Sequence, residues 1–141
     1  MKNEVKTVSC IFCNIINDSS ESNVLYEDKH CLVILDINPI RSGHTLVIPK
    51  QHVSDINGLS DERYLAIMAV VKQMSHHLQK NLNPVKVGLA VVGLDIDHLH
   101  IHLVPMHEYH DLTSKFYLDG TIKRASNDTL NKMKEKLTAV D

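Results

Sequence analysis

The sequence has few aromatic residues and no block of basic residues. Only 4% of its 141 residues are aromatic and tryptophan is absent. The stacked aromatic platforms that bind single-stranded nucleic acid are therefore not expected. The formal net charge is −2, and the lysines and arginines are dispersed along the chain, which argues against a footprint on a phosphate backbone. We expect no nucleic-acid partner.

The sequence also lacks a long apolar run and an even set of cysteines. No stretch approaches the roughly 18 apolar residues of a membrane helix, so no membrane partner is expected. The first residues, MKNEVK, are polar, whereas a secretory signal has an apolar centre there. The three cysteines are an odd number for disulfide pairing. Together these features predict a cytoplasmic protein in a reducing compartment.

Histidine, by contrast, is abundant, and three of the ten histidines form one motif. Residues 98–105 read HLHIHLVP, which places His98, His100 and His102 at every second position. Successive side chains of a β-strand point to opposite faces. The segment therefore predicts a strand with three imidazoles on one face and three aliphatic side chains in the core. Pro105 is expected to end this strand or to mark an edge.

Three imidazoles on one face are compatible with two kinds of chemistry. A partly exposed strand that carries histidines on its polar face by chance would show the same alternation. Chance accounts more readily for one histidine on such a face than for three. Imidazole nitrogens can ligate zinc or iron. A neutral imidazole, with an ordinary pKa near 6.5, can also attack phosphorus as a nucleophile. The motif alone leaves both kinds of chemistry open.

The hydrophobic pattern predicts one α+β domain over residues 1–141, built on an antiparallel sheet. Strands are expected at residues 24–27, 31–35, 44–49, 85–92 and 98–105. Helices are expected at 10–17, from an N-cap at Ser60 to 81–83, and from 127 through Leu130, Met133 and Leu137. Residues 1–9 are expected to form a loose tail, and residues 106–125 to be irregular.

Two separated blocks of sequence carry a resemblance to a known family. Residues 36–52 read DINPIRSGHTLVIPKQH, and the motif at 98–105 follows. In this order the blocks resemble the histidine triad (HIT) family of nucleotide hydrolases and transferases, and most of all its compact Hint-type branch. The resemblance covers residues 9–106 and leaves 107–141 as a C-terminal extension. It implies a HIT-like fold with about five antiparallel strands, one long and one short helix, and a homodimer.

The resemblance also implies a reaction and the residues that perform it. The expected substrates are nucleoside 5′-monophosphate derivatives, namely phosphoramidates or mixed anhydrides of AMP or GMP. His100 matches the nucleophile that forms a nucleotidyl-histidine intermediate, while His102 and His44 match positions that contact the phosphate or orient the site. Asp36 matches the carboxylate that holds the ribose hydroxyls. The apolar walls of the purine pocket are matched by Phe12, Ile15, Ile34 and Ile37, each of which could instead pack in the core.

A second constellation combines Cys10 and Cys13 with His52 and His98. A CxxC pair alone could be a redox pair, but two histidines elsewhere in the chain complete the set for a Cys2His2 zinc site. Some members of the family carry zinc at these matching positions, and others lack the cysteines. We expect one structural zinc and no metal for catalysis, so that His98 is a ligand and not a phosphate contact. Cys31 lies among aliphatic residues and is expected in the core.

The link before the histidine motif departs from the family's pattern. Hint-type enzymes carry a longer loop there, often with a serine that serves the leaving group, whereas residues 92–97 read VGLDID. Asp95 is expected to face solvent and Asp97 to point away from the imidazoles, which leaves the leaving-group acid unassigned. Two other functions stay open. One is a zinc or iron metalloenzyme with His98, His100 and His102 as ligands, and the other is a purine-nucleotide-binding regulatory module with little turnover.

Overall fold

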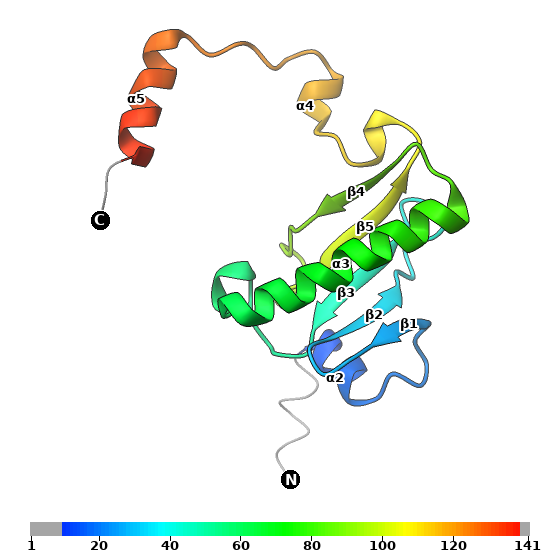
Figure 1. The fold of residues 1–141 in the computed structure, drawn as a ribbon. Coiled ribbons are helices and arrows are strands. Elements are labelled where there is room, and N and C mark those ends of the chain that lie inside the picture. The colour runs from blue at the N-terminus through cyan, green and yellow to red at the C-terminus, as the bar shows by residue number, and fades with distance from the viewer. Residues whose placement is uncertain (1–9, 139–141) are drawn as a thin grey trace.

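The chain folds into a five-stranded antiparallel sheet with a long helix across one face (Figure 1). The computed structural model describes residues 10–138, so the tail expected at 1–9 lies outside the described residues. The strands are β1 (Val24–Glu27), β2 (Cys31–Leu35), β3 (Thr45–Pro49), β4 (Lys86–Ala90) and β5 (Ile101–Met106), in the spatial order β1-β2-β3-β5-β4. The helices are α2 (Ile11–Asn17), α3 (Asp61–Leu82), α4 (Lys115–Leu118) and α5 (Asn127–Thr138). The expected α+β class with an antiparallel sheet is confirmed.

The strand that carries the histidines is shorter at its start than the alternation predicts. β5 begins at Ile101, so His98 and His100 precede it. β5 then continues through Pro105 to Met106, and the expectation that Pro105 ends the strand is wrong.

The position of Pro105 in the sheet explains why a proline is tolerated there. It pairs with Val87 of β4 on one side. The ladder between β3 and β5 reaches only to Leu103. At Pro105, therefore, β5 is paired on one side only, and the missing N–H of proline leaves no hydrogen bond unmade on the other side. This agrees with the second expectation for Pro105, that it marks an edge.

The other elements differ from expectation by small amounts. β3 begins at Thr45 and β4 covers residues 86–90 of the expected 85–92. Residues 106–125 are not wholly irregular, because they contain a 3-10 turn η2 (Tyr109–Asp111) and the short helix α4. A second 3-10 turn, η1 (Ile56–Gly58), precedes α3.

Local signals determine where α3 begins and ends. The Ser60 hydroxyl accepts a hydrogen bond from the Arg63 amide and caps the first turn. Asn83 takes a left-handed conformation with a φ of 51° and ends the helix before Pro84. The buried stripe of α3 consists of Ile67, Val70, Val71, Met74 and Leu78. It packs on the sheet in one cluster with Cys31, which is fully buried as expected.

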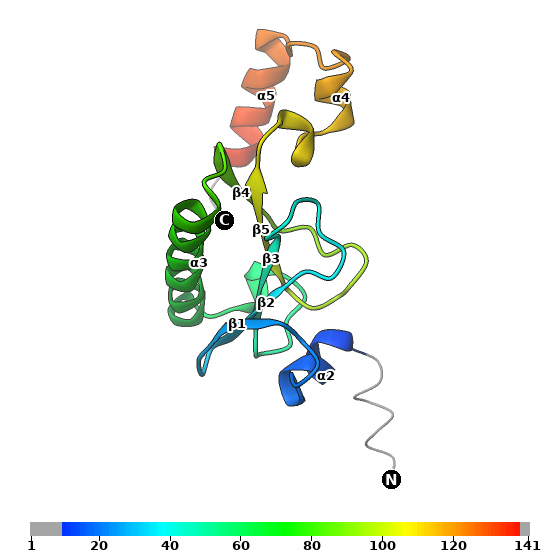
Figure 2. The ribbon, with the colours of Figure 1, turned by 90° about the vertical axis from the view of Figure 1, so that its right-hand side faces the viewer.

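The opposite face of the sheet carries α2 and the histidines. Phe12 of α2 packs there in a second buried cluster, with Leu32, Ile34, Leu46 and Ile48. His102 lies opposite Leu46 in the ladder between β3 and β5. Figure 2 shows α3 and α2 on opposite sides of the sheet. The long helix α3 therefore covers one face of the sheet, while the histidines lie on the other face, together with α2.

Beyond η2 the chain runs outward from the sheet into α4 and α5 (Figure 1). No helix within residues 10–138 is both long and apolar enough to cross a bilayer.

Candidate active site and metal centre

His100 has one ring nitrogen committed to the backbone. Its Nδ1 lies 2.7 Å from the carbonyl oxygen of His98. A carbonyl can only accept, so Nδ1–H is the donor and Nε2 carries the lone pair. The ring is buried, and its centroid lies 4.9 Å from that of Phe12 in an edge-on contact. The geometry therefore assigns His100 the tautomer that a nucleophilic Nε2 requires.

His44 and His102 are joined in a hydrogen-bond chain that starts at a backbone amide. The N–H of Ile40 donates to His44 Nδ1 over 3.0 Å, so a neutral His44 carries its proton on Nε2. That nitrogen lies 2.9 Å from His102 Nδ1 and donates to it. His102 then keeps its own proton on Nε2. Burial lowers the pKa of both His44 and His102, which favours these neutral forms.

Two imidazoles with opposite hydrogen-bonding roles thus lie side by side. The ring centroids of His100 and His102 are 4.9 Å apart. His100 offers a lone pair at Nε2, and His102 offers a proton at its own Nε2. A nucleophile next to a hydrogen-bond donor is what an attack on an anionic phosphoryl group needs.

Asp36 follows β2 and faces the same histidine pair. One carboxylate oxygen lies 3.5 Å from His44 Nε2, and the other accepts the Asn38 amide over 2.8 Å. The carboxylate acts on the pKa of His44 in the direction opposite to burial, and the effect of burial is larger. Asp36, His44 and His102 form a compact group whose ligand-type atoms lie within 4.8 Å of one another.

The two cysteines and two histidines of the second constellation come together. Cys10 Sγ lies 3.4 Å from His98 Nδ1, and Cys13 Sγ lies 3.2 Å from His52 Nδ1. The two Nδ1 atoms are 3.1 Å apart. Tetrahedral zinc binds sulfur at about 2.3 Å and nitrogen at about 2.0–2.1 Å, which places neighbouring ligand atoms roughly 3.3–3.8 Å apart. The donor set and its spacing fit zinc.

His98 is held in the orientation that such a site requires. Its Nε2–H donates to the Pro49 carbonyl over 2.8 Å, which leaves Nδ1 for the metal. Within residues 10–138, no group of metal-type donors unites His98, His100 and His102. The three imidazoles of the motif are therefore divided between two sites, which disfavours the metalloenzyme that would use all three.

The four residues expected to wall a purine pocket have different environments. Phe12 and Ile34 are buried in the cluster beneath α2, and Ile15 is partly buried against it. Ile37 is 83% exposed, just beyond Asp36. The burial of Phe12 and Ile34 fits core packing, the alternative interpretation, while Ile37 is exposed. Base recognition by these residues stays a prediction.

The link before the motif directs its two carboxylates away from the histidines. Asp97 accepts a hydrogen bond from the Ser54 hydroxyl at the surface. Asp95 is exposed and accepts the amide of Ile96 over 3.0 Å. Asp95 still acts at a distance, because its charge opposes the lowering of the His102 pKa by burial.

An ion pair that the sequence pattern did not reveal supports the loop before His44. Arg41 Nε donates to Asp111 over 3.0 Å, and Asp111 is 6% exposed. Hydrogen bonds from the amides of His107 and Glu108, together with the guanidinium, lower the pKa of Asp111 to about 2. The pair ties the loop that carries the Ile40 amide to the chain after β5. Asp111 lies outside both motif blocks, so no local pattern pointed to it.

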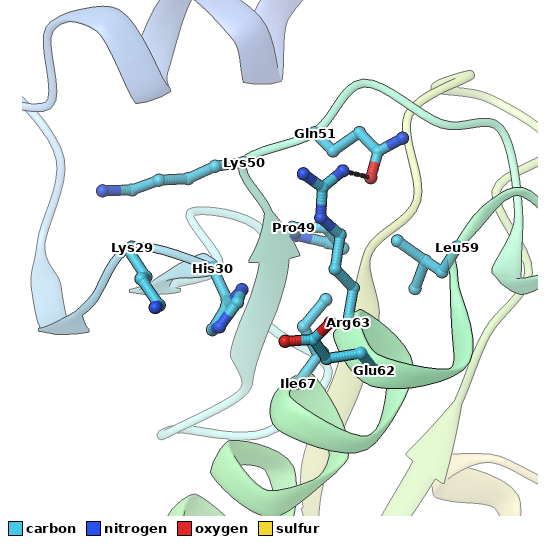
Figure 3. A pocket seen from close by; sticks show the side chains of 9 residues that line it. All are labelled: Lys29, His30, Pro49, Lys50, Gln51, Leu59, Glu62, Arg63 and Ile67. Atoms are coloured by element: carbon cyan, nitrogen blue, oxygen red, sulfur yellow. Dashed lines mark hydrogen bonds between the residues drawn. The ribbon is translucent and has the colours of Figure 1, made fainter.

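A hollow of about 570 Å³ lies between the end of β3 and the start of α3 (Figure 3), and His44, His100 and His102 are not among its lining residues. Three cationic residues line it, Lys29, Lys50 and Arg63, together with Glu62. Lys50 already pairs with Glu27 over 2.7 Å, and Arg63 donates to Gln51. Because two of its three cations have partners and a carboxylate is present, this hollow is a poor candidate for the nucleotide site.

Comparisons with known proteins bear on the site. The HIT domain profile matches residues 17–109. An uncharacterized HIT-like protein from Methanocaldococcus jannaschii is 36% identical over 87% of this chain and 96% of its own length. The adenosine 5′-monophosphoramidase HNT1 of Saccharomyces cerevisiae is 30% identical over 93% of this chain and 82% of its own length.

Solved structures resemble the fold. A HIT family protein from Bacillus anthracis superposes with a TM-score of 0.74 at 30% identity, covering 91% of this chain and 94% of its own. A zinc-bound histidine triad family protein from Mycobacterium smegmatis superposes with a TM-score of 0.64 at 32% identity, covering 70% of this chain and 76% of its own. The first match leaves about 13 of the 141 residues uncovered, so it extends into the segment after η2.

Proposed function

The chain belongs to the HIT family, and on that premise we propose that it hydrolyses nucleoside 5′-monophosphate derivatives with His100 as the nucleophile. The observation that carries the proposal is the hydrogen bond from His100 Nδ1 to the His98 carbonyl, which leaves Nε2 free to attack. A relative named as an adenosine 5′-monophosphoramidase supports the substrate class. Phosphoramidates and mixed anhydrides of AMP or GMP are the proposed substrates.

The reaction proceeds in two displacements at the α-phosphorus. His100 Nε2 forms a bond to phosphorus while the bond to the leaving group breaks, which gives a nucleotidyl-histidine; an amine departs with a proton taken from solvent, and an acid departs as its anion. The His98 carbonyl accepts Nδ1–H and so stabilises the positive charge that develops on the ring. Water then attacks phosphorus and gives up a proton to solvent as the bond from phosphorus to Nε2 breaks, which releases the nucleoside monophosphate and restores the neutral His100. His102 Nε2–H, which the hydrogen-bond chain leaves uncommitted, donates to the phosphoryl group.

The nucleoside is held beside this pair. The Asp36 carboxylate accepts the two ribose hydroxyls, the usual way in which a protein holds a vicinal diol. Ile37, which is 83% exposed beside Asp36, covers one face of the base. An apolar contact of this kind discriminates weakly between adenine and guanine.

Zinc in this proposal is structural. Cys10, Cys13, His52 and His98 would hold it, and four protein ligands leave no open position for substrate. Bound zinc supplies a cross-link, which ties α2 and the connector after β3 to the residue two places before His100. A zinc-bound relative supports the assignment.

We extend the proposal to a homodimer that buries the surface between α3 and β4. β4 is an edge strand of the sheet, and its Leu89 and the following Val91 are about half exposed. An exposed apolar edge is normally covered. A hollow of about 160 Å³ beside it is lined by Ile56, Tyr64, Met68, Leu89, Ala90, Val91 and Ile101.

Steady-state turnover of adenosine 5′-phosphoramidate tests the proposed activity. We expect the wild-type protein to release AMP and His100→Asn to lose at least 10³-fold in kcat, within the roughly 10⁶-fold lost when a nucleophile is removed from a hydrolase. His107→Asn, which alters an exposed histidine five residues after His102, is the matched control and should retain full activity. Undiminished turnover by His100→Asn would overturn the proposal, and tight AMP binding without turnover in wild type would favour a regulatory module.

A further inference from the structure

The loop of residues 37–43 carries the amide that begins the hydrogen-bond chain through His44. Residues 37–40 of this loop are exposed. The Ile40 amide donates to His44 Nδ1 over 3.0 Å, and the Arg41 carbonyl accepts the His44 amide over 2.9 Å. Both bonds depend on the path that the backbone takes just before His44. Because an exposed loop loses conformational entropy when it is fixed, a further contact is needed to hold that path.

The side chain of Arg41 supplies this contact. Its Nε donates to Asp111 Oδ1 over 3.0 Å, and its Nη2 donates to Glu108 Oε2 over 3.3 Å. The Glu108 side chain is 61% exposed, so that ion pair stabilises the loop little. The Asp111 side chain is only 3% exposed, and removal of its cation would leave a buried carboxylate unpaired. Asp111 is therefore the partner that fixes Arg41.

Asp111 is itself held by the segment that follows β5. Its Oδ2 accepts the amides of His107 and Glu108 over 2.9 Å and 3.2 Å. This segment directly continues β5, the strand that carries His102. The ion pair thus attaches the loop to the continuation of the strand that bears the far end of the hydrogen-bond chain. Both ends of that chain are held by one part of the fold.

The ion pair reaches beyond the part of the chain that the family profile describes. The HIT domain profile matches residues 17–109, so Asp111 lies outside it. The pKa of Asp111 is lowered to about 2, mainly by the amide of His107, so its carboxylate is ionised throughout the range in which histidines titrate. The pair is therefore intact at every pH at which a neutral His44 can act.

We propose that Arg41 and Asp111 are positioning residues for hydrolysis, because their ion pair fixes the loop so that the Ile40 amide holds His44 Nδ1. This inference rests on the proposed function, and it extends the active site to the segment after β5. Without the pair, His44 is free to exchange its tautomer, and His102 then no longer keeps its proton on Nε2. Loss of the pair therefore lowers kcat and leaves the hold on the nucleoside unchanged.

NMR of the full-length protein, labelled with ¹⁵N at histidine, tests this contact without any substrate. Long-range correlations between ring protons and nitrogens report which nitrogen of an imidazole carries the proton. We expect His44 to carry its proton on Nε2 in wild type, and to show a mixture of both tautomers in Arg41→Ala and in Asp111→Asn. Arg63→Ala removes an exposed arginine that donates to Gln51, and this matched control should keep the wild-type pattern. An unchanged His44 tautomer in Arg41→Ala and Asp111→Asn would overturn the proposal, as would a proton on Nδ1 in wild type.

A double-mutant cycle tests whether the pair acts through His44. Arg41→Ala should lower kcat for adenosine 5′-phosphoramidate about tenfold with KM unchanged, within the range of coupling between residues in one hydrogen-bond network. Arg41→Lys, which keeps a cation beside Asp111, should recover most of this loss. In a His44→Asn background, Arg41→Ala should cause no further loss, because no imidazole is left to orient. A second tenfold loss in that background would contradict the proposal.

His100→Asn is measured in parallel, so that a failed positioning pair and a failed nucleophile are told apart. Undiminished turnover by His100→Asn would refute the proposed function, and the tautomer of His44 in Arg41→Ala would then decide the role of the pair alone. Normal loss of activity in His100→Asn, with additive losses from Arg41→Ala and His44→Asn, would refute the pair and leave the nucleophile in place.

Discussion

His44 controls the protonation of a residue other than itself. The Ile40 amide holds His44 Nδ1 as an acceptor, and His44 Nε2–H then holds His102 Nδ1 as an acceptor. This hydrogen-bond chain therefore places the proton that, in the proposed reaction, His102 donates to the phosphoryl group. The backbone amide of Ile40 thus sets the hydrogen-bonding role of His102, to which it is connected through the His44 ring.

The first prediction concerns the hydrogen-bond chain from Ile40 through His44 to His102. His44→Asn should lower kcat for adenosine 5′-phosphoramidate by roughly 10²-fold, the lower end of what a positioned proton donor contributes. The KM should change little, because the bond between His44 and His102 does not hold the nucleoside. Steady-state kinetics measure both, with His110→Asn as the control at an exposed position. A kcat that is unchanged in His44→Asn would refute the relay.

The second prediction concerns stability and pH. Burial lowers the pKa of His44 and His102 in the folded protein, while in the unfolded chain it stays near 6.5. Below about pH 6.5 the unfolded chain binds more protons at these two histidines than the folded protein does. The contribution of neutral His44 and His102 to stability is therefore complete above that pH, and it is lost as the pH falls toward their pKa in the folded protein. We expect Tm to drop from pH 7 to pH 5.5, and to drop less steeply in His44→Asn. Thermal melts at matched ionic strength test this, and equal slopes would contradict it.

Among the elements, we expect α2 to depend on the proposed metal centre for its position. It has seven residues and a single buried side chain, Phe12. Cys10 and Cys13 bring it to His98, which lies just before β5. Loss of the metal should therefore loosen α2 and the residues that lead to His100.

The third prediction tests this coupling. Wild type should carry about one zinc per chain, and Cys13→Ser should lose it and melt at a lower temperature. Cys31→Ala is the matched control, because Cys31 is a buried core thiol and should leave the zinc in place. Metal analysis and thermal melts give the readouts. Equal zinc content in Cys13→Ser and wild type would remove the site.

The sequence predicted elements whose signals are local. Ser60 and the apolar stripe of α3 were enough to place that helix. The alternation of 98–105 correctly separated Ile101 and Leu103, which face α3, from the imidazoles. It placed the start of β5 too early, because His98 turns to cysteines 85 or more residues away. Contacts of that range leave no mark on a local pattern.

At the scale of the whole molecule, the fold brings two distant blocks of sequence to one face of the sheet. The pairing of β3 with β5 places His44, which directly precedes β3, within reach of His102. Chain order suggested that these blocks belong together. The ion pair between Arg41 and Asp111, which supports the loop before His44, could not be predicted, since nothing near Asp111 marks it as a partner.

In the proposed reaction His100 attacks phosphorus and carries the nucleotide. The most direct test is mass spectrometry of the full-length protein, quenched in alkali during turnover of adenosine 5′-phosphoramidate. We expect an AMP adduct on the peptide that contains His100 in wild type, and none in His100→Asn. Full turnover without an adduct in wild type, together with equal activity in His100→Asn, would contradict it.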